Sequence, residues 1–237
     1  MVTPPPKASS RIQAMFSDIS PHYDFMNGLM TAGRHHAWRR AVAREAARDL
    51  ASGGIALDAC TGTGDFALAI RREAPGATVV GTDFAGEMLR IGLKKVERAG
   101  GIFLGRADTL RLPFRDASFR AVTIGWGIRN VEDTAAGLRE LARVLQPGGR
   151  LHILESSVPR GVLGRLGFRV YCLGIVPWLG RLLSRTPHDA YSYLPRSVAA
   201  FHTPESLASL MRDCGFTAVS WRTMALGGVS WHSGTRP

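Results

Sequence analysis

The clearest indication of how this chain folds is the segment Leu57-Asp58-Ala59-Cys60-Thr61-Gly62-Thr63-Gly64-Asp65. It joins a short apolar run, Ile55–Ala59, to an amphipathic run, Asp65–Arg72, which predicts a strand followed directly by a helix. Gly62 and Gly64 permit the tight turn between them, because glycine adopts positive φ and lets a ligand approach the backbone. We therefore expect a nucleotide-type binding loop here. A tight turn without a ligand is the alternative.

The same alternation of apolar and amphipathic runs continues along the chain, which is typical of βαβ units and a parallel sheet. The predicted strands are Ile55–Ala59, Thr78–Asp83, Ile102–Arg106, Ala121–Trp126 and Leu151–Glu155. The predicted helices are Asp65–Arg72, Glu87–Ala99 and Thr134–Leu145, the last of them ended by Gln146-Pro147-Gly148-Gly149.

The regular alternation stops at both ends of the chain. Before Ile55, we expect two helices that cover the C-terminal edge of the sheet, around Ile12–Phe16 and His35–Leu50. After residue 156, a glycine-rich and arginine-rich stretch precedes a predicted helix, Pro204–Cys214, and two strands, Ala218–Met224 and Val229–His232, joined through Gly227-Gly228. The prediction is one α/β domain over residues 1–237, with a helical lid at 1–50 and a substrate-facing or membrane-facing insertion at 157–200.

Acidic side chains end the strands next to the glycine loop. Asp58 ends the first strand, Asp83 ends the second, and Asp108-Thr109 follows the third. A carboxylate at Asp83 suits the two hydroxyls of a ribose, and one at Asp108 suits the amino group of an adenine. The loop also matches Gly62-x-Gly64-x-x-Ala67, the permissive dinucleotide fingerprint. However, three carboxylates fit the cationic S-adenosylmethionine better than the pyrophosphate of NAD.

Composition places the chain among ordinary globular proteins, with 237 residues, 45% hydrophobic and 21% charged. Its three cysteines are too few and too scattered for a disulfide framework or a zinc site, so we expect no metal and a reducing cytoplasm. The longest apolar run, 170–180, is about half of the ~20 residues that span a bilayer, and no signal peptide is recognisable.

The formal net charge of +11 predicts a polyanionic partner, either nucleic acid or an anionic membrane surface. The middle of the chain, 51–155, is nearly neutral, so the excess of positive charge lies at the two ends. Five arginines and no acidic residue occur among the apolar side chains of 156–185: Arg160, Arg165, Arg169, Arg181 and Arg185. Such a segment suits the surface of an anionic membrane. A helix flanking the substrate pocket, or a homodimer interface, is the alternative.

Several longer motifs resemble one family, the demethylmenaquinone/ubiquinone C-methyltransferases of quinone biosynthesis. The resemblance begins with Met15-Phe-Ser-Asp-Ile-Ser-Pro-His-Tyr-Asp24, Met26-Asn27 and His35-x-x-Trp38-Arg39. It includes Gly125-Trp-Gly-Ile-Arg-Asn-Val131, Tyr191-x-Tyr-Leu-Pro195 and the ending Gly227-Gly228-Val229-x-x-His232, and it covers residues 11–232 in register. Two departures concern the substrate rather than the cofactor: Trp126 replaces a usual Phe, and Phe201-His202-Thr203 replaces Phe-Pro-Asp.

The resemblance implies a Rossmann-like class I methyltransferase with a seven-stranded, mostly parallel sheet closed by an antiparallel hairpin. It implies S-adenosylmethionine as cofactor and a prenylated quinol as substrate, most simply demethylmenaquinol, with a ubiquinone-pathway benzoquinol as the alternative. The cofactor contacts implied are Thr63, Asp83, Asp108 and Thr109. With Asp58, Gly62 and Gly64 they make up the expected cofactor site.

Methylation of a quinol carbon requires a proton acceptor and a positive group near the developing phenolate. We predict Arg129 as that positive group, with Asn130 holding its loop; the alternative is a structural clamp that pairs Arg129 with Asp24 or Glu132. Asp24 is predicted as a lid contact or proton relay, or else as a helix cap. Tyr23, Asn27 and Trp126 are the predicted substrate contacts. The enzyme is expected in the cytoplasm, on the inner face of the cell membrane.

Three other functions compete with this one. A nucleic-acid methyltransferase is disfavoured because the chain has no Asn-Pro-Pro-Tyr type motif, no appended RNA-binding module and no basic surface interleaved with aromatics. An NAD-dependent dehydrogenase lacks an obvious Tyr-x-x-x-Lys pair or hydride-pocket histidine. A membrane-associated binding protein without turnover is disfavoured by the intact Asp83, Asp108 and Arg129.

Overall fold

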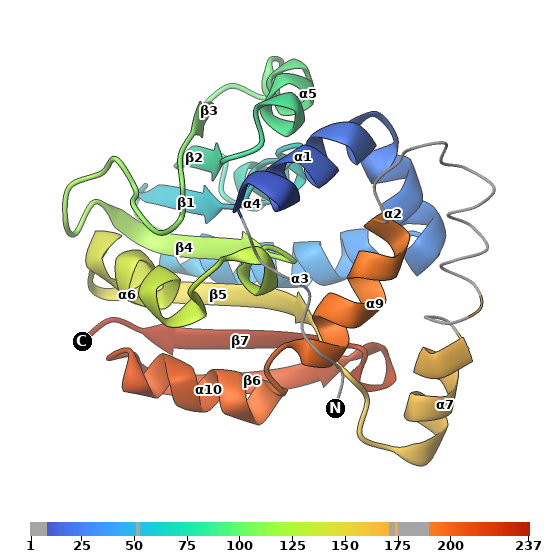
Figure 1. Cartoon of the computed structure of the whole chain (residues 1–237). Coiled ribbons are helices and arrows are strands. Elements are labelled where there is room, and N and C mark those ends of the chain that lie inside the picture. The colour runs from blue at the N-terminus through green and yellow to red at the C-terminus, as the bar shows by residue number, and fades with distance from the viewer. Residues whose placement is uncertain (1–8, 51–52, 171–173, 175–189) are drawn as a thin grey trace.

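A seven-stranded sheet organises the computed structural model, which describes residues 9–50, 53–170, 174 and 190–237 (Figure 1). The strand order is β3-β2-β1-β4-β5-β7-β6. The first five strands pair in parallel, and β7 pairs antiparallel with both β5 and β6. The strands are β1 (Ile55–Ala59), β2 (Thr78–Asp83), β3 (Ile102–Arg106), β4 (Phe119–Gly125), β5 (Leu145–Ser156), β6 (Thr217–Met224) and β7 (Val229–Thr235).

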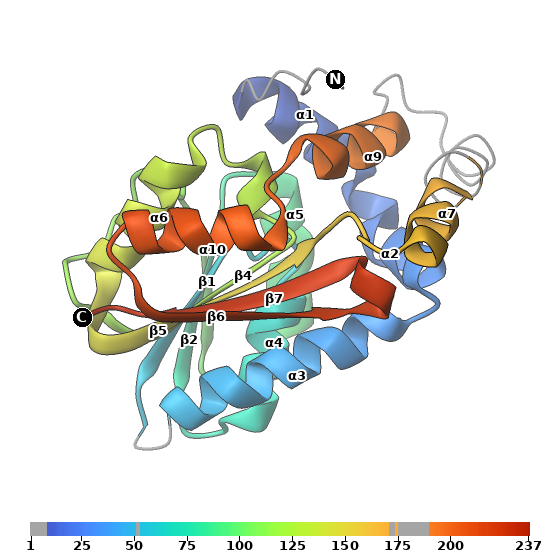
Figure 2. The same cartoon turned by 90° about the horizontal axis from the view of Figure 1, so that it is seen from below.

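Helices cover both faces of the sheet, with α3 and α4 on one face and α6 and α10 on the other (Figure 2). The helices are α1 (Ser9–Ile19), α2 (Tyr23–Thr31), α3 (Arg34–Asp49), α4 (Asp65–Glu73), α5 (Gly86–Val96), α6 (Thr134–Val144), α7 (Val162–Val170), α9 (Ala190–Ala200) and α10 (Pro204–Asp213). Short 3-10 turns are η1 (Ser20–His22), η2 (Ile128–Asn130) and η4 (Ala225–Gly227). The predicted α/β class and the closing antiparallel hairpin are confirmed.

Each face of the sheet has its own apolar core. Leu138 of α6 and Leu207 of α10 pack on one face against side chains such as Ile153 of β5. Val42 of α3 and Phe66 of α4 pack on the other face. The central strands are buried on both sides, which explains why they are continuous apolar runs rather than alternating ones.

The N-terminal region differs from the prediction. The predicted helix His35–Leu50 corresponds to α3, but α3 packs on the face of the sheet against β4 and β5 rather than on its C-terminal edge. The buried side chains Val42, Ala43 and Ala46 form the apolar stripe that requires this position. A helix that the prediction omitted, α2, contacts the glycine loop instead. It has only nine residues and contains Asn27-Gly28, which favour helices poorly, so its helical signal in the sequence is weak.

Strand β5 begins at Leu145, six residues before the predicted start. The predicted turn Gln146-Pro147-Gly148-Gly149 lies inside it as a bulge, because the pairing with β4 passes from Leu145 directly to Arg150. Gly148 and Gly149 instead exchange backbone hydrogen bonds with Arg236 near the C-terminus. The helix ends before these residues, as predicted, but they belong to the strand and not to a turn that precedes it.

The predicted insertion at 157–200 contains α7 and α9. Arg181 and Arg185 of the predicted basic segment lie outside the described residues, as do most of its apolar side chains. Within the described ranges, no helix combines the length and the apolar character that crossing a bilayer requires.

Candidate active site

The glycine loop connects β1 to α4 with three residues at positive φ, Cys60 (+52°), Gly62 (+57°) and Gly64 (+79°). The Gly62 N–H donates to Asp83 Oδ2 at 2.8 Å, which fixes the loop to the end of β2. A Cβ built on Gly62 would meet no heavy atom within 4 Å, so the backbone is open to a ligand at this point. The two glycines therefore provide the turn and the accessible backbone that the sequence predicted.

Asp58 lies beneath this loop. Its Oδ1 accepts from Thr123 Oγ1 at 2.8 Å and its Oδ2 accepts from Thr61 Oγ1 at 2.5 Å. Burial raises the pKa of Asp58 to about 6, although both threonine hydrogen bonds act in the opposite direction. With 1% of its surface exposed, Asp58 supports the loop from below.

Asp83 and the residues after β3 lie beside the loop at the carboxyl edge of the sheet, where open α/β sheets bind ligands. Asp83 Oδ1 accepts from the Ala85 N–H at 2.9 Å, and burial raises the pKa of this carboxyl. Asp108 Oδ1 accepts from the Leu110 N–H at 2.9 Å in an exposed turn. Thr109 is buried and its Oγ1 lies 3.3 Å from Cys60 Sγ, so it links the turn after β3 to the glycine loop.

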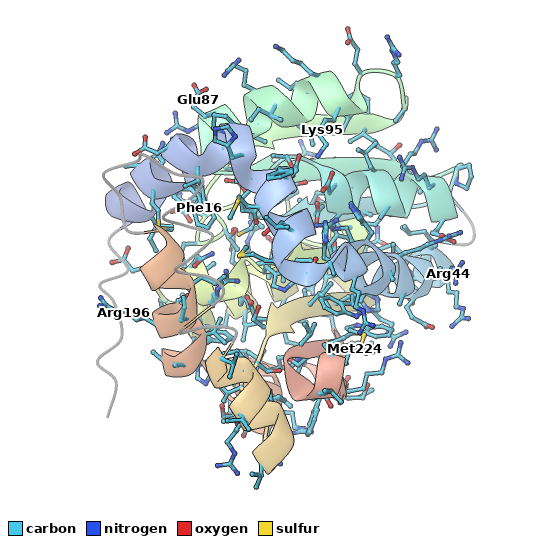
Figure 3. All side chains as sticks on the ribbon, turned by 90° about the vertical axis from the view of Figure 1, so that its right-hand side faces the viewer. Phe16, Arg44, Glu87, Lys95, Arg196 and Met224 are labelled. Carbon is cyan, nitrogen blue, oxygen red and sulfur yellow. The ribbon has the colours of Figure 1, made fainter. Side chains whose placement is uncertain are left out.

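Asp24 of α2 joins the N-terminal region to the glycine loop. Its Oδ1 accepts from Thr63 Oγ1 at 2.7 Å, and its Oδ2 accepts from Lys95 Nζ at 2.8 Å. Lys95 reaches from α5 toward the start of α4, where it also pairs with Asp65 (Figure 3). Asp24 therefore has the geometry of the predicted lid contact. Sequence reasoning missed Lys95, which looks like an ordinary basic residue in the last turn of a helix.

The loop after β4 is organised by Arg129. Trp126 adopts φ +54°, and its carbonyl accepts from Arg129 Nη1 at 2.6 Å and from Asn130 Nδ2 at 3.4 Å. Arg129 Nη1 also donates to Glu155 Oε1 at 2.7 Å. The buried carboxylate that pairs with Arg129 is thus Glu155, at the end of β5, and the carboxyl of Asp24 is engaged elsewhere.

Asn130 links this loop to the insertion, because its Oδ1 accepts from Tyr193 OH of α9 at 2.9 Å. Asn130 therefore bonds both to the Trp126 carbonyl of its own loop and to Tyr193 of α9. Tyr193 was not singled out beforehand, although it lies in the Tyr191-x-Tyr-Leu-Pro195 motif.

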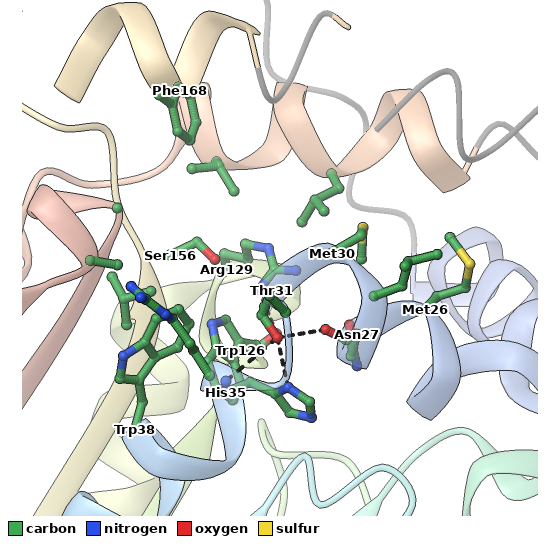
Figure 4. Close-up of a pocket in the computed structure, with 18 of the residues that line it drawn as sticks. Met26, Asn27, Met30, Thr31, His35, Trp38, Trp126, Arg129, Ser156 and Phe168 are labelled. Atoms are coloured by element: carbon green, nitrogen blue, oxygen red, sulfur yellow. Dashed lines mark hydrogen bonds between the residues drawn. The ribbon is translucent and has the colours of Figure 1, made fainter. Parts of the chain in front are cut away.

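A cavity of about 620 Å³ opens beside these residues, and its wall is mostly apolar. Tyr23, Asn27, Trp126 and Arg129 all line it, whereas the glycine loop, Asp24 and Asn130 do not. Figure 4 shows Phe168 of α7 on one side of the cavity and Trp38 and Trp126 on the other. Further lining side chains are Met15, Met26, Met30, Tyr193, Leu194, Val198 and Leu226.

Two polar side chains in the cavity wall are held in their neutral forms. Burial raises the pKa of Tyr23, although a hydrogen bond from Asn27 and the charges of Arg129 and Arg39 counteract it. Burial and then the charge of Arg39 lower the pKa of His35 to about 4. Thr31 Oγ1 donates to the Asn27 carbonyl at 2.7 Å, so His35 Nδ1 is the donor in its 2.7 Å contact with Thr31 (Figure 4).

Comparison with known proteins identifies relatives along the whole chain. The model of the ubiE/COQ5 methyltransferase family matches residues 6–236. A demethylmenaquinone methyltransferase of Thermus thermophilus is 46% identical over 94% of this chain and 100% of its own length. One from Roseiflexus castenholzii is 42% identical over 100% of this chain and 98% of its own. A ubiquinone/menaquinone biosynthesis C-methyltransferase of Geobacter sulfurreducens is 41% identical over 95% of this chain and 88% of its own length.

Solved structures share the fold. A methyltransferase of Thermotoga maritima has a TM-score of 0.61 at 20% identity, covering 94% of this chain and 100% of that one. A phosphoethanolamine N-methyltransferase of Haemonchus contortus, solved with S-adenosylmethionine, has a TM-score of 0.59 at 16% identity. The match covers 78% of this chain and 49% of that one. Taken with the open glycine loop, these matches show that the chain belongs to the ubiE/COQ5 methyltransferase family and is an S-adenosylmethionine-dependent methyltransferase.

Proposed function

We propose that the enzyme methylates a ring carbon of a prenylated quinol and converts demethylmenaquinol to menaquinol. The observation that carries the proposal is the apolar cavity of about 620 Å³, which has Arg129 and Tyr23 in its wall and lies beside the glycine loop. A quinol ring with an isoprenoid tail needs such an apolar space with few polar groups. Two of the relatives compared are named demethylmenaquinone methyltransferases. The name of the Geobacter relative supports a ubiquinone-pathway benzoquinol as the second candidate.

The residues around the glycine loop fit S-adenosylmethionine. Asp83 has both carboxylate oxygens oriented by backbone N–H groups, and their remaining lone pairs suit the two ribose hydroxyls. Asp108 and Thr109 suit the adenine, and Thr63 with the open backbone of the glycine loop suits the rest of the cofactor. Asp58 contributes by holding the loop in shape.

When bound, the cofactor supplies an electrophilic methyl group on a sulfonium. The chain's own residues bind and orient the quinol and exclude water, which accounts for much of the catalysis in such a displacement. The quinol hydroxyl gives its proton to an acceptor, directly or through water, and Arg129 stabilises the negative charge of the phenolate that results. The phenolate makes the adjacent ring carbon nucleophilic. Once that carbon carries the methyl group, it releases its hydrogen as a proton, which restores the aromatic ring. Tyr23 stays protonated because burial raises its pKa, so its O–H can donate to the phenolate oxygen. Asn27 and Trp126 complete the contacts with the ring.

The proposed lid is limited to α1 and α2, because α3, which the predicted lid of 1–50 included, packs on the face of the sheet. The substrate-facing and membrane-facing segment is assigned to 157–200. In the described part of that segment, α7 exposes Val162 (83%), Leu166 (58%) and Val170 (56%). Their spacing of four residues places them on one side of the helix. Arg160 and Arg165 are also exposed, while Phe168 lines the cavity. This arrangement supports docking of α7 on an anionic membrane that holds the quinol, at the inner face of the cell membrane.

Purified enzyme, S-adenosylmethionine and reduced demethylmenaquinone test the reaction. We expect mass spectrometry to detect menaquinone with the new methyl group on the ring carbon, and we expect Asp83→Asn to abolish it. A parallel assay with a ubiquinone-pathway benzoquinol measures the second candidate reaction. Methylation of an oxygen, or of neither quinol, would contradict the proposal. The quinones of a strain that lacks this protein provide the matching test in the cell, because demethylmenaquinone should accumulate there.

A further inference from the structure

Arg39 of α3 is a buried cation with unused hydrogen-bonding capacity. Its side chain is about 10% exposed, and its guanidinium lies 5.5 Å from the centre of the Trp126 ring. Nη1 donates to Asp65 Oδ2 at 3.4 Å, which is a long contact for an ion pair. Nε is buried and has no hydrogen-bond partner among the described residues. Because a guanidinium carries five N–H donors, most of the capacity of Arg39 remains available to a ligand.

The neighbouring cations are engaged more completely. Lys95 donates to Asp24 at 2.8 Å and to Thr63 at 3.1 Å, and it also pairs with Asp65. Arg129 makes two short bonds through Nη1, to Glu155 and to the Trp126 carbonyl, although its Nε, like that of Arg39, is buried without a partner among the described residues. Among the described residues, the contacts of Arg39 are the long one with Asp65 and the face of an aromatic ring, although burying a charge is costly unless it is well paired. Its surroundings therefore suit an additional anion.

The strand order indicates which anion that would be. The sheet runs β3-β2-β1-β4, so Asp108, Asp83, the glycine loop and Trp126 follow one another along its carboxyl edge. If the adenine binds at Asp108 and the ribose at Asp83, the methionine portion of the cofactor extends past the glycine loop toward Trp126. Arg39 stands at that end, over Trp126 and bonded to Asp65, the residue that follows Gly64. It also lines the substrate cavity, which the transferred methyl group must face.

We infer that Arg39 binds the α-carboxylate of the methionine portion of the cofactor, through charge-assisted hydrogen bonds from its guanidinium. The inference rests on the proposed placement of adenosine over the ends of β2 and β3. Asp65 holds Arg39 in position from the side of the glycine loop, and Trp126 supports the face of the guanidinium. Trp126 thus lies between the cofactor and the quinol cavity and contributes to both sites.

Calorimetric binding of two ligands tests the inference without turnover. S-adenosylhomocysteine carries the amino acid portion, whereas 5′-methylthioadenosine shares its adenosine and sulfur but has no carboxylate. We expect Arg39→Met to lower the affinity for S-adenosylhomocysteine by roughly 10- to 100-fold and to leave that for 5′-methylthioadenosine within about twofold. Arg39→Lys should lie between, because lysine keeps the charge but not the planar fork. Arg44→Met removes an exposed arginine of the same helix and should change neither affinity.

Equal losses for both ligands in Arg39→Met, or no loss for either, would overturn the assignment of the carboxylate to Arg39. If Arg39→Met does not fold in a thermal melt, the ratio of the two affinities in Arg39→Lys decides instead. Asp83→Asn tests the placement of the adenosine separately, because it should lower the affinities for both ligands together. If Asp83→Asn leaves both affinities unchanged, it is the adenosine placement that fails.

Discussion

At the scale of single residues, Asp58 gives the fold a dependence on pH. Its pKa is about 6 in the folded protein, above its ordinary value of 3.8, because the side chain is buried. Between about pH 4 and pH 6, Asp58 stays protonated in the folded protein but ionises in the unfolded chain. Its contribution to stability is therefore fully present below about pH 4 and is lost as the pH rises through about 6. We expect Asp58→Asn to remove that loss, which amounts to on the order of 3 kcal/mol between pH 4 and pH 7.

Urea unfolding of wild type and Asp58→Asn across this range measures the difference in unfolding free energy, in the absence of cofactor. Asp213→Asn, at an exposed aspartate in the last turn of α10, is the matched control and should parallel the wild type. Parallel curves for Asp58→Asn and wild type would show that the buried carboxyl does not have this role.

The buried pair of Arg129 and Glu155 couples stability to catalysis. Removing Arg129 alone leaves Glu155, which is 0% exposed, without its counter-ion. We expect Arg129→Met to lower the unfolding free energy by about 3–5 kcal/mol, and the double variant with Glu155→Gln to regain most of it. Gln keeps one acceptor oxygen, which can still accept from the N–H of Ser156.

The double variant also tests the proposed role of Arg129 in the reaction. Its turnover should fall by about 100-fold or more, because the group that stabilises the phenolate is gone, while S-adenosylhomocysteine still binds. Turnover within a few-fold of wild type, with cofactor affinity unchanged, would show that Arg129 has a structural role and does not stabilise the phenolate.

At the scale of elements, α2 is held to the glycine loop and to α5 by Asp24. The Asp24 side chain is 39% exposed, so the contact contributes less than about 1 kcal/mol. We expect Asp24→Ala to lower the hydrogen-exchange protection of α1 and α2 by about two- to fivefold while the sheet stays protected. Lys95 keeps its pairing with Asp65 in this variant.

Glu87→Ala removes an exposed ion pair on α5 and serves as the control for the lid. Unchanged exchange in α2 of Asp24→Ala would mean that packing, including Met26, holds the lid without this contact. A loss of protection that extends to β1 and β4 would indicate general destabilisation rather than opening of the lid.

At the scale of the whole molecule, part of the net charge of +11 comes from the arginines of the basic segment 156–185. The described part of the basic segment contains α7, whose exposed apolar side chains lie beside a cavity suited to a lipid tail. We expect the wild type to float with vesicles that contain an anionic lipid, and less so at high salt. Val162→Asp with Leu166→Asp should abolish flotation, whereas Leu93→Asp, an exposed leucine on α5, should not.

No flotation of the wild type, with Arg160 and Arg165 intact, would contradict membrane docking. A fall in molecular mass of the Val162→Asp and Leu166→Asp variant in solution would instead identify α7 as a homodimer interface. Light scattering at the concentrations used for flotation distinguishes the two.

Most of the strands and the glycine loop could be predicted from the sequence, because they depend on local signals. β1, β2 and β3 match the predicted ranges residue for residue, since short apolar runs between turn residues have few alternatives. The family resemblance, carried by contiguous motifs such as Gly125–Val131, determined the cofactor and the kind of reaction.

The pairing of charged side chains could not be predicted, because it depends on the tertiary structure. Lys95 joins Asp24 and Asp65 from separate elements, and Glu155 pairs with Arg129 across 26 residues of sequence. No local pattern marks such partners, because they depend on where distant helices pack on the sheet. The position of α3 is a second example. Its apolar stripe predicted a helix, but only its packing on the face of the sheet places Arg39 between the glycine loop and the cavity.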